Sequence, residues 1–403
     1  MTIRFLATGK AIAALKSAVG RTFRQGKPGK LRAATGRALI ALVMVAALVI
    51  GSLLFMRPAA QSQAVLPAAE PQPPSSTAAS TGPSVLEVSA PVPAQAPQQQ
   101  PQQQGKSALE SWAAGLSGPL DIPERTLIGY ANGELTLRKE QPNCHLSWVT
   151  LAGIGKASSD HGRYGGDLLK SDGTLNKPLG AVPLQGAAGE AATEQRGGPL
   201  QLTQQQLKRG GGGNIQDVDD AATATGRVLC SGGTNLQAGQ SWWKAIANYR
   251  ASDLFRQQVL GNAQLYATLS QNPATGKAPA ARAVRFALDQ IGLPYVWGGN
   301  GPDSGSAGFD CSGLTKAAYD AAGISLQRTA DSQFRSVLPV PPTGLPKMGD
   351  LVFYGNPATR IHHVGLYLGN GLMINAPTEG MAVQIATYHV TGDDYAGAGH
   401  PAN

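Results

Sequence analysis

The chain has 403 residues, which is room for two or three domains, and only 14% of them are charged. Its net charge of +8 is concentrated in residues 1–37, which carry nine Lys or Arg residues and no acid. The rest of the chain is close to neutral, so the composition argues against nucleic-acid binding. The six histidines and the few acids show no ligand spacing such as His-Glu-x-x-His, so we expect no metal and no other cofactor.

Residues 38–56 are apolar or small at every position, which is about enough to cross a bilayer as one helix. The basic tail at 1–37 predicts a cytoplasmic N-terminus, with everything after residue 57 outside the cell membrane. We therefore predict a single-pass membrane protein. The alternative is a signal peptide, which would be cleaved at the small residues around Ser62 and Ala64.

Residues 57–106 are rich in Pro, Ala and Gln, and they end in a glutamine-rich run. Such a composition cannot bury a core, so we expect a disordered, extended tether. Two ordered regions follow at 107–268 and 281–403, and a short linker at 269–280 joins them. The first region has helical patterns at 148–155, 218–229 and 242–249, and the second begins with a helical pattern at 281–291.

In the second region, Cys311 stands between a glycine-rich loop and a helical pattern at 314–322. The positive end of a helix favours the thiolate, which is the nucleophilic form of cysteine. His363 opens an alternating strand, and a turn at 369–371 predicts a hairpin that brings Asn375 beside it. Neighbouring strand residues point to opposite faces, so only one of His362 and His363 can face Cys311. Cys, His and Asn together are the groups of a thiol hydrolase.

These motifs resemble the NlpC/P60 family of papain-like cell-wall peptidases. The resemblance is carried, in the family's order, by residues 292–299, 309–313, 349–354, 363–369 and 374–377. It implies a papain-like α+β fold, with Cys311 as nucleophile, His363 as base and Asn375 orienting the imidazole. The alternative is that Cys311 is a buried structural cysteine and His363 an ordinary strand histidine.

The same resemblance implies a substrate and the residues that hold it. The family's usual target is the γ-D-glutamyl–diamino acid bond of peptidoglycan stem peptides. Tyr295 corresponds to a tyrosine near the thiolate, and Asp310, Ser312 and Arg328 correspond to positions that hold the charged ends of the stem peptide. Asp310 as a helix cap and Arg328 as a solvated loop charge are the structural alternatives.

The first region resembles a lytic transglycosylase, a lysozyme-like enzyme that cuts glycan strands. The resemblance lies in residues 151–163, 198–202, 218–222 and 249–253. The family's general acid is a Glu before a Ser, and here Ser158 and Ser159 occupy the pair. A serine cannot protonate a glycosidic oxygen, and nothing in the spacing supports Glu190 or Glu194 as a substitute. We predict an inactive domain that binds glycan or is structural, in which His161 is a packing or hydrogen-bonding residue.

Cys144 and Cys230 resemble a bridging pair in related secreted domains. A bridge would close a loop of about 86 residues, worth on the order of 4 kcal/mol through chain entropy, and would leave Cys311 as the reactive thiol. Two free buried thiols are the alternative.

The sequence thus predicts a membrane-anchored α+β protein with a mostly helical, lysozyme-like domain before its peptidase domain. We expect it to hydrolyse peptidoglycan stem peptides on the wall side of the cell membrane. By analogy with wall-opening proteins of Gram-positive conjugation systems, its partners would include a secretion or conjugation machine. The alternatives are a non-catalytic peptidoglycan-binding scaffold of such a machine, and a bifunctional hydrolase whose glycan-cleaving domain is active.

Overall fold

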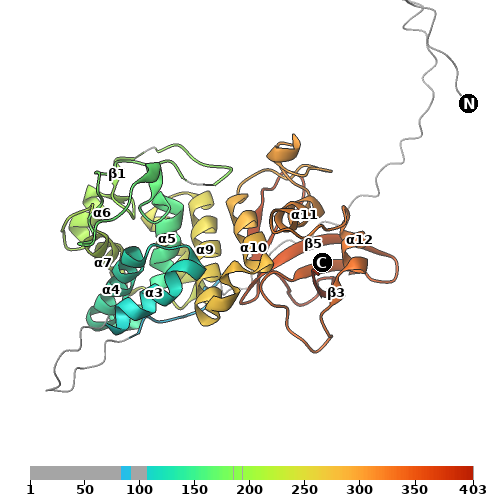
Figure 1. Cartoon of the computed structure of the whole chain (residues 1–403), viewed down its shortest axis with the longest axis horizontal. Coiled ribbons are helices and arrows are strands. Elements are labelled where there is room, and N and C mark those ends of the chain that lie inside the picture. Colours follow the sequence, from blue (N-terminus) through green and yellow to red (C-terminus); the bar gives the residue numbers. More distant parts are fainter. Residues whose placement is uncertain (1–82, 92–106, 185, 193, 403) are drawn as a thin grey trace, which may run out of the picture. The chain divides into compact units, whose positions relative to one another are not determined.

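The computed structural model describes residues 83–91, 107–184, 186–192 and 194–402 (Figure 1). All of them belong to one of the two units into which the chain divides, residues 70–403. The predicted basic tail at 1–37 and the predicted membrane segment at 38–56 lie outside the described residues. None of the described helices has the length and apolar character that a membrane crossing requires.

The first region is helical, as its periodicity predicts (Figure 1). Its helices are α3 (Ala108–Leu120), α4 (Glu124–Glu140), α5 (Trp148–Ser159), α6 (Gln204–Arg209), α7 (Val218–Leu229), α8 (Gly239–Tyr249) and α9 (Asp253–Gln271). Short 3-10 turns lie at η1 (Pro142–Cys144), η2 (Tyr164–Gly166) and η3 (Ser231–Gly233), and β1 (Arg196–Gly197) pairs with β2 (Leu202–Thr203).

The centre of this region is α5, in which every residue except Lys156 is buried. It packs against α9, and Gly153 makes the close approach possible because a Cβ there would lie 2.6 Å from the carbonyl oxygen of Val259. The helix starts at Trp148, whose backbone N–H donates to Oε2 of the buried Glu134 at 2.9 Å. The predicted disulfide is present: Cys144, at the end of η1, is bonded to Cys230 directly after α7.

The second region combines helices with a six-stranded antiparallel sheet, which confirms the predicted mixture of helix and sheet. The strands are β3 (Leu338–Pro339), β4 (Leu351–Asn356), β5 (Arg360–Gly369), β6 (Leu372–Asn375), β7 (Gln384–Thr387) and β8 (Tyr395–His400), in the spatial order β3-β8-β4-β5-β6-β7. Around it are α10 (Pro279–Asp289), η5 (Pro302–Ser304), α11 (Cys311–Ala321) and α12 (Ala330–Ser336). Both α11 and α12 contact β5, which lies inside the sheet (Figure 1).

The predicted linker at 269–280 is folded. Helix α9 continues to Gln271, the 3-10 turn η4 (Pro273–Lys277) follows, and α10 starts at Pro279. The turn packs against α3, where Gly276 approaches the backbone of Pro119 so closely that a Cβ would lie 2.5 Å from its carbonyl oxygen. The interpretation as linker was wrong because a composition of Pro, Gly and polar residues is equally suited to a packed turn.

The predicted tether at 57–106 is also not uniform. Residues 83–91, which we call the strap, form no helix or strand but pack on the ordered regions, and Ala90 is buried. The Asn370 side chain donates to the Ser84 carbonyl at 2.9 Å, and the Leu86 N–H donates to Gln264 of α9 at 3.0 Å. The strap carries Val85, Leu86 and Val88 within the Pro- and Ala-rich tract, and their partial burial against the core offsets part of the entropy cost of ordering it.

Candidate active site

Cys311 is the first residue of α11, which is where the sequence predicts it. Asp310 caps this helix, and its Oδ1 accepts the Gly313 N–H at 2.6 Å. Gly313 has to be a glycine, because a Cβ there would lie 2.0 Å from the carbonyl oxygen of Gly299 in the preceding loop. The glycine-rich loop is thereby held against the first turn of α11, and Cys311 is at the positive end of the helix dipole.

His363 and Asn375 come from the adjacent antiparallel strands β5 and β6, as the hairpin pattern predicts. Nδ2 of Asn375 lies 3.0 Å from Nε2 of His363, and both side chains are buried. Cys311 Sγ lies 4.0 Å from the carbonyl oxygen of His362, the residue before His363 on β5. The structure thus places the Cys311 thiol against the backbone of β5 next to His363, whose imidazole contacts the amide of Asn375.

The electrostatics of His363 follow from its burial. Burial lowers the pKa of His363 to about 4, the nearby His362 acts in the same direction, and Asp394 opposes it. The imidazole is therefore neutral at neutral pH and able to accept a proton. His362 points elsewhere, since its Nε2 lies 2.6 Å from Asp394 Oδ2, which agrees with the prediction that alternation leaves only one of the two histidines for Cys311.

The predicted substrate-binding residues Asp310, Ser312 and Arg328 form one hydrogen-bonded cluster. Arg328 donates to both carboxylate oxygens of Asp310, at 3.0 and 2.7 Å, and to Ser312 Oγ at 3.0 Å. Asp310 also accepts the Gly298 N–H at 3.0 Å, so most acceptor positions of its carboxylate are occupied by hydrogen bonds within the protein. The Arg328 side chain is 35% exposed and is the member of the cluster that a ligand can reach. Tyr295 is buried, and its backbone bridges to Phe309.

Comparison with known proteins bears on this second region. The NlpC/P60 family model matches residues 292–396. The peptidoglycan endopeptidase RipB of Mycobacterium tuberculosis is 35% identical over 178 residues, which is 39% of this chain and 70% of that relative.

The chain belongs to the NlpC/P60 family. Members of this family are cysteine peptidases, so the prediction that the second region is an NlpC/P60 cysteine peptidase domain is confirmed. The match to the bifunctional muramidase/DL-endopeptidase CwlT of Bacillus subtilis has 33% identity over 191 residues, 47% of this chain and 55% of the relative. A γ-D-glutamyl-L-lysine dipeptidyl-peptidase of Bacillus cereus is 38% identical over 112 residues, 27% of this chain and 32% of the relative. For other curated relatives, the chain spans about a quarter of their length.

The two serines of the helical region that the sequence resemblance aligns with a transglycosylase acid are inaccessible to solvent. Ser158 and Ser159 are buried at the end of α5, where they donate to the backbone carbonyls of Leu200 and Pro199 at 3.4 and 2.5 Å. His161 is fully buried between the hydroxyls of Tyr130 and Tyr266, at 3.2 and 2.8 Å from its ring nitrogens, and burial lowers its pKa. This is the packing and hydrogen-bonding role that the sequence predicts for His161.

Two further features of the described residues were not predicted. Asp394, the partner of His362, lies outside every motif, and its only sequence signal is the acidic pair 393–394 in a region with few acids. Glu190 and Glu194 do line a pocket together, with Arg196 and Arg250, although their spacing gave no reason to expect one. Among the described residues, the structure has no cluster of acidic, His and Cys side chains suited to a metal ion.

Proposed function

We propose that this chain is a peptidoglycan endopeptidase that cleaves the γ-D-glutamyl–diamino acid bond of stem peptides through Cys311. The observation that carries the proposal is the hydrogen-bonded pair of His363 and Asn375 on adjacent strands, next to the helix start that bears Cys311. The names of the relatives support the substrate: RipB is a peptidoglycan endopeptidase, and the Bacillus cereus relative acts on a γ-D-glutamyl-L-lysine bond.

The mechanism follows from the three side chains. His363 takes the Cys311 proton, and the thiolate attacks the peptide carbonyl to form an acyl-enzyme. His363 then gives that proton to the leaving amine and activates the water that releases the acyl group. The backbone N–H of Cys311 at the start of α11 would donate to the oxyanion, and the helix dipole would add to the effect.

The role of Asn375 depends on which amide atom faces the imidazole. When His363 accepts the thiol proton on Nδ1, Nε2 carries a hydrogen and needs an acceptor. The Asn375 oxygen has no hydrogen-bond partner within the described residues, and rotating the amide places this oxygen against Nε2. We infer that Oδ1 accepts from Nε2–H during catalysis and stabilises the imidazolium.

The test is digestion of purified peptidoglycan by the full chain, with the products resolved by mass spectrometry. We expect stem-peptide fragments cut between D-γ-glutamate and the diamino acid, and no such fragments from Cys311→Ala or His363→Ala. His389→Ala is the matched control, since His389 is exposed and bonded to Asp393. Undiminished release by Cys311→Ala would refute the proposal, and cleavage at another bond would refute the assigned substrate.

The anchoring of the enzyme is a second part of the proposal, and it rests on the sequence. Residues 38–56 would hold the protein in the cell membrane, with the catalytic region on the wall side. Protease treatment of intact spheroplasts should digest the catalytic region and leave a membrane-protected N-terminal fragment. A soluble product whose N-terminus begins near Ala64 would establish the cleaved signal peptide instead.

For the helical region we propose glycan binding without glycan cleavage. The buried serines support the absence of cleavage, because the acid position has no proton donor. The bifunctional name of CwlT favours the alternative of an active domain. Anhydro-muramyl products from the Cys311→Ala protein would establish that alternative, and failure of the same variant to sediment with sacculi would refute binding.

Local opening of the wall for a secretion or conjugation machine is the process we propose, by analogy of domain order. Its test is cross-linking in cells followed by identification of the partners. Recovery of envelope-spanning machine components supports it, and recovery of septal proteins alone would refute it.

A further inference from the structure

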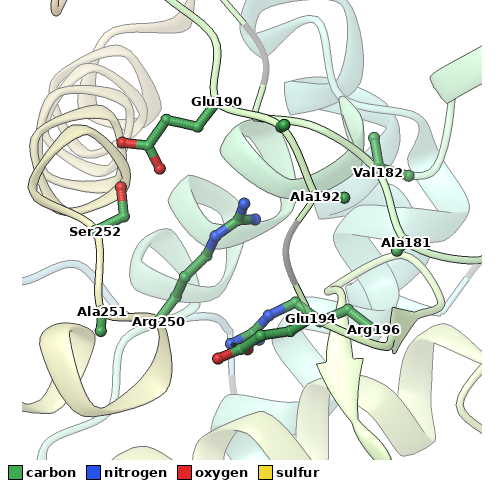
Figure 2. A pocket seen from close by; sticks show the side chains of 10 residues that line it. Ala181, Val182, Glu190, Ala192, Glu194, Arg196, Arg250, Ala251 and Ser252 are labelled. Carbon is green, nitrogen blue, oxygen red and sulfur yellow. Dashed lines mark ion pairs between the residues drawn. The ribbon is translucent and has the colours of Figure 1, made fainter.

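The helical region contains a pocket of about 290 Å³ in which several charged side chains meet (Figure 2). One wall is the segment that precedes and includes β1, and the other is the connection from α8 to α9. The polar side chains that line it are Glu190, Glu194, Arg196, Arg250 and Ser252. None of these residues belongs to the Cys311 site.

Arg250 is the central group of this pocket. It directly follows α8 and is only 9% exposed, and its guanidinium carbon lies 5.5 Å from the centre of the Phe255 ring. Its Nη1 atom is buried, and within the described residues it has no hydrogen-bond partner. Figure 2 shows the guanidinium extending into the space between Glu190 and Glu194. A buried charged donor without an acceptor is costly, so this atom is suited to an anionic ligand.

Arg196, the second arginine of the pocket, has its guanidinium paired with acceptors of the protein. Arg196 forms an ion pair with Glu194 at 2.5 Å and donates to the carbonyl oxygens of Gln201 and Tyr249, at 2.9 and 3.1 Å. The Arg196 guanidinium therefore has a structural role and is not available to bind a ligand. Glu190 lowers the electrostatic cost of Arg250, but the two form no ion pair, and Figure 2 shows the Glu190 carboxylate turned toward Ser252. Arg250 thus lines the pocket with one guanidinium donor that has no acceptor among the described residues.

The charges also restrict the kind of anion. Glu190 and Glu194 border the same space, and two carboxylates repel a multiply charged group such as phosphate. A single carboxylate suits the planar fork of a guanidinium, and the remaining ligand can donate from a hydroxyl, amide or amine to Glu190. The volume is near the lower end of the range for small-molecule sites, about 300–1,000 Å³, so it suits one sugar or one or two amino acids.

We propose that this pocket binds a carboxylate-bearing unit of peptidoglycan, with Arg250 holding the carboxylate. Two groups in the polymer have this chemistry: the lactyl carboxylate of N-acetylmuramic acid at positions where the stem peptide has been removed, and the α-carboxylate of a stem peptide. The choice of polymer rests on the proposed function, whereas the carboxylate chemistry rests on Arg250. The site would hold a glycan chain or its peptide on the helical region, although the acid for cutting glycan is missing.

The first experiment measures binding of small probes to the full chain carrying Cys311→Ala, by ligand-observed NMR. The probes are N-acetylmuramic acid, N-acetylglucosamine, an L-Ala-γ-D-Glu-diamino acid tripeptide and inorganic phosphate. We expect N-acetylmuramic acid or the tripeptide to bind at least tenfold more tightly than N-acetylglucosamine and phosphate, and the tighter probe identifies the source of the carboxylate. Equal binding of N-acetylglucosamine, preference for phosphate, or no binding of either carboxylate would overturn the proposal.

Two variants locate the binding. Arg250→Gln should weaken the carboxylate probe by at least tenfold, and Arg209→Gln, an exposed arginine on α6, should leave it unchanged. In case Arg250→Gln unfolds, Ala192→Phe fills the pocket from its rim without changing a charge and should also abolish binding. Wild-type affinity in either folded variant would overturn the assignment.

The proposal and the endopeptidase function fail in different ways. With Cys311 intact, a pocket that binds no carboxylate while stem peptides are still cleaved would refute only the pocket. Carboxylate binding that depends on Arg250, in a protein that releases no peptide, would refute only the endopeptidase.

Discussion

The contact between Asn375 and His363 offers the sharpest test of the catalytic geometry. The two atoms lie 3.0 Å apart on adjacent strands, and both residues are at least 94% buried, so no solvent replaces the amide when it is removed. Asn375→Ala therefore leaves the imidazolium without its acceptor at the moment that His363 carries the Cys311 proton.

The size of the effect follows from the charge on the ring. A hydrogen bond to a charged group contributes about 1.5–3 kcal/mol, which corresponds to about a ten- to hundredfold loss in rate. Since neither nucleophile nor base is removed, Asn375→Ala should keep measurable activity, whereas Cys311→Ala should have none. The loss should fall mainly on kcat, because Asn375 acts through His363 and not on the substrate.

The assay is release of the dipeptide from a synthetic stem peptide across a range of pH. Asn375→Asp supplies the acceptor that we infer for Oδ1, so it should be more active than Asn375→Ala. Its added negative charge should raise the pKa of His363 and move the acidic limb of the profile to higher pH. Asn356→Ala, at the exposed end of β4, is the matched control.

Two results would refute the reasoning. Wild-type kcat in Asn375→Ala, with unchanged thermal stability, would mean that the amide does not orient His363. An Asn375→Asp protein as impaired as Asn375→Ala would mean that the nitrogen, and not the oxygen, serves Nε2.

The other predictions concern the pH profile, substrate binding and stability. Because burial lowers the pKa of His363 to about 4, the acidic limb of kcat/KM should lie near pH 4, and a limb at about 6.5 would contradict the assignment. The unfolded chain takes up this proton at about pH 6.5, so the free energy of unfolding should decrease as the pH is lowered from about 6.5 to about 4. Arg328→Lys should raise KM with little change in kcat, and an unchanged KM with a lowered Tm would make Arg328 purely structural. Reducing the Cys144–Cys230 bridge, or replacing both residues by Ser, should lower the free energy of unfolding by about 4 kcal/mol in denaturant titration, with no effect of reductant on the double variant. Glu134→Ala removes the acceptor of the Trp148 and Ala90 backbone N–H groups and should lower the free energy of unfolding by about 2 kcal/mol or more. A Tm equal to that of the wild type would contradict this prediction.

The sequence was sufficient for the second region because its local signals agree with its tertiary structure. A helix start after the glycine-rich loop, an alternating strand and a glycine turn each specify local geometry, and the turn predicts that His363 and Asn375 meet. That Cys311 joins them was implied by the resemblance to the NlpC/P60 family. Strand alternation also separates His362 from His363, and Asp394 keeps His362 occupied. These short-range rules act within the hairpin of β5 and β6 and need no knowledge of the rest of the fold, whereas the position of Cys311 against β5 is a long-range contact.

The features that escaped prediction depend on long-range contacts. The strap is held by hydrogen bonds to Gln264 and Glu134, which are far from it in the chain. The composition of a tract rich in Pro and Ala gives no indication of such distant partners. The pocket at Arg250 likewise joins a segment without regular structure to the end of α8. Whether Arg250 is paired or free depends on a few side-chain positions, and no periodicity encodes these.

The contacts of α9 explain why the helical region can matter for an enzyme whose chemistry resides elsewhere. Gly261 on this helix has no Cβ, which would lie 2.3 Å from Leu288 of α10 and 2.7 Å from Ile385 of β7, so helix and sheet share one hydrophobic core. The Gln257 side chain accepts the Ile385 N–H at 2.8 Å, and Gln264 of the same helix holds the strap. A glycan or peptide captured by the helical region would therefore remain on the polypeptide that carries Cys311. Capture of this kind raises the effective concentration of nearby stem peptides without adding any contact at the thiol. Under this proposal the helical region has a function that requires no cleavage of glycan, and Arg250→Gln should raise the KM for polymeric peptidoglycan but not the KM for a short free peptide.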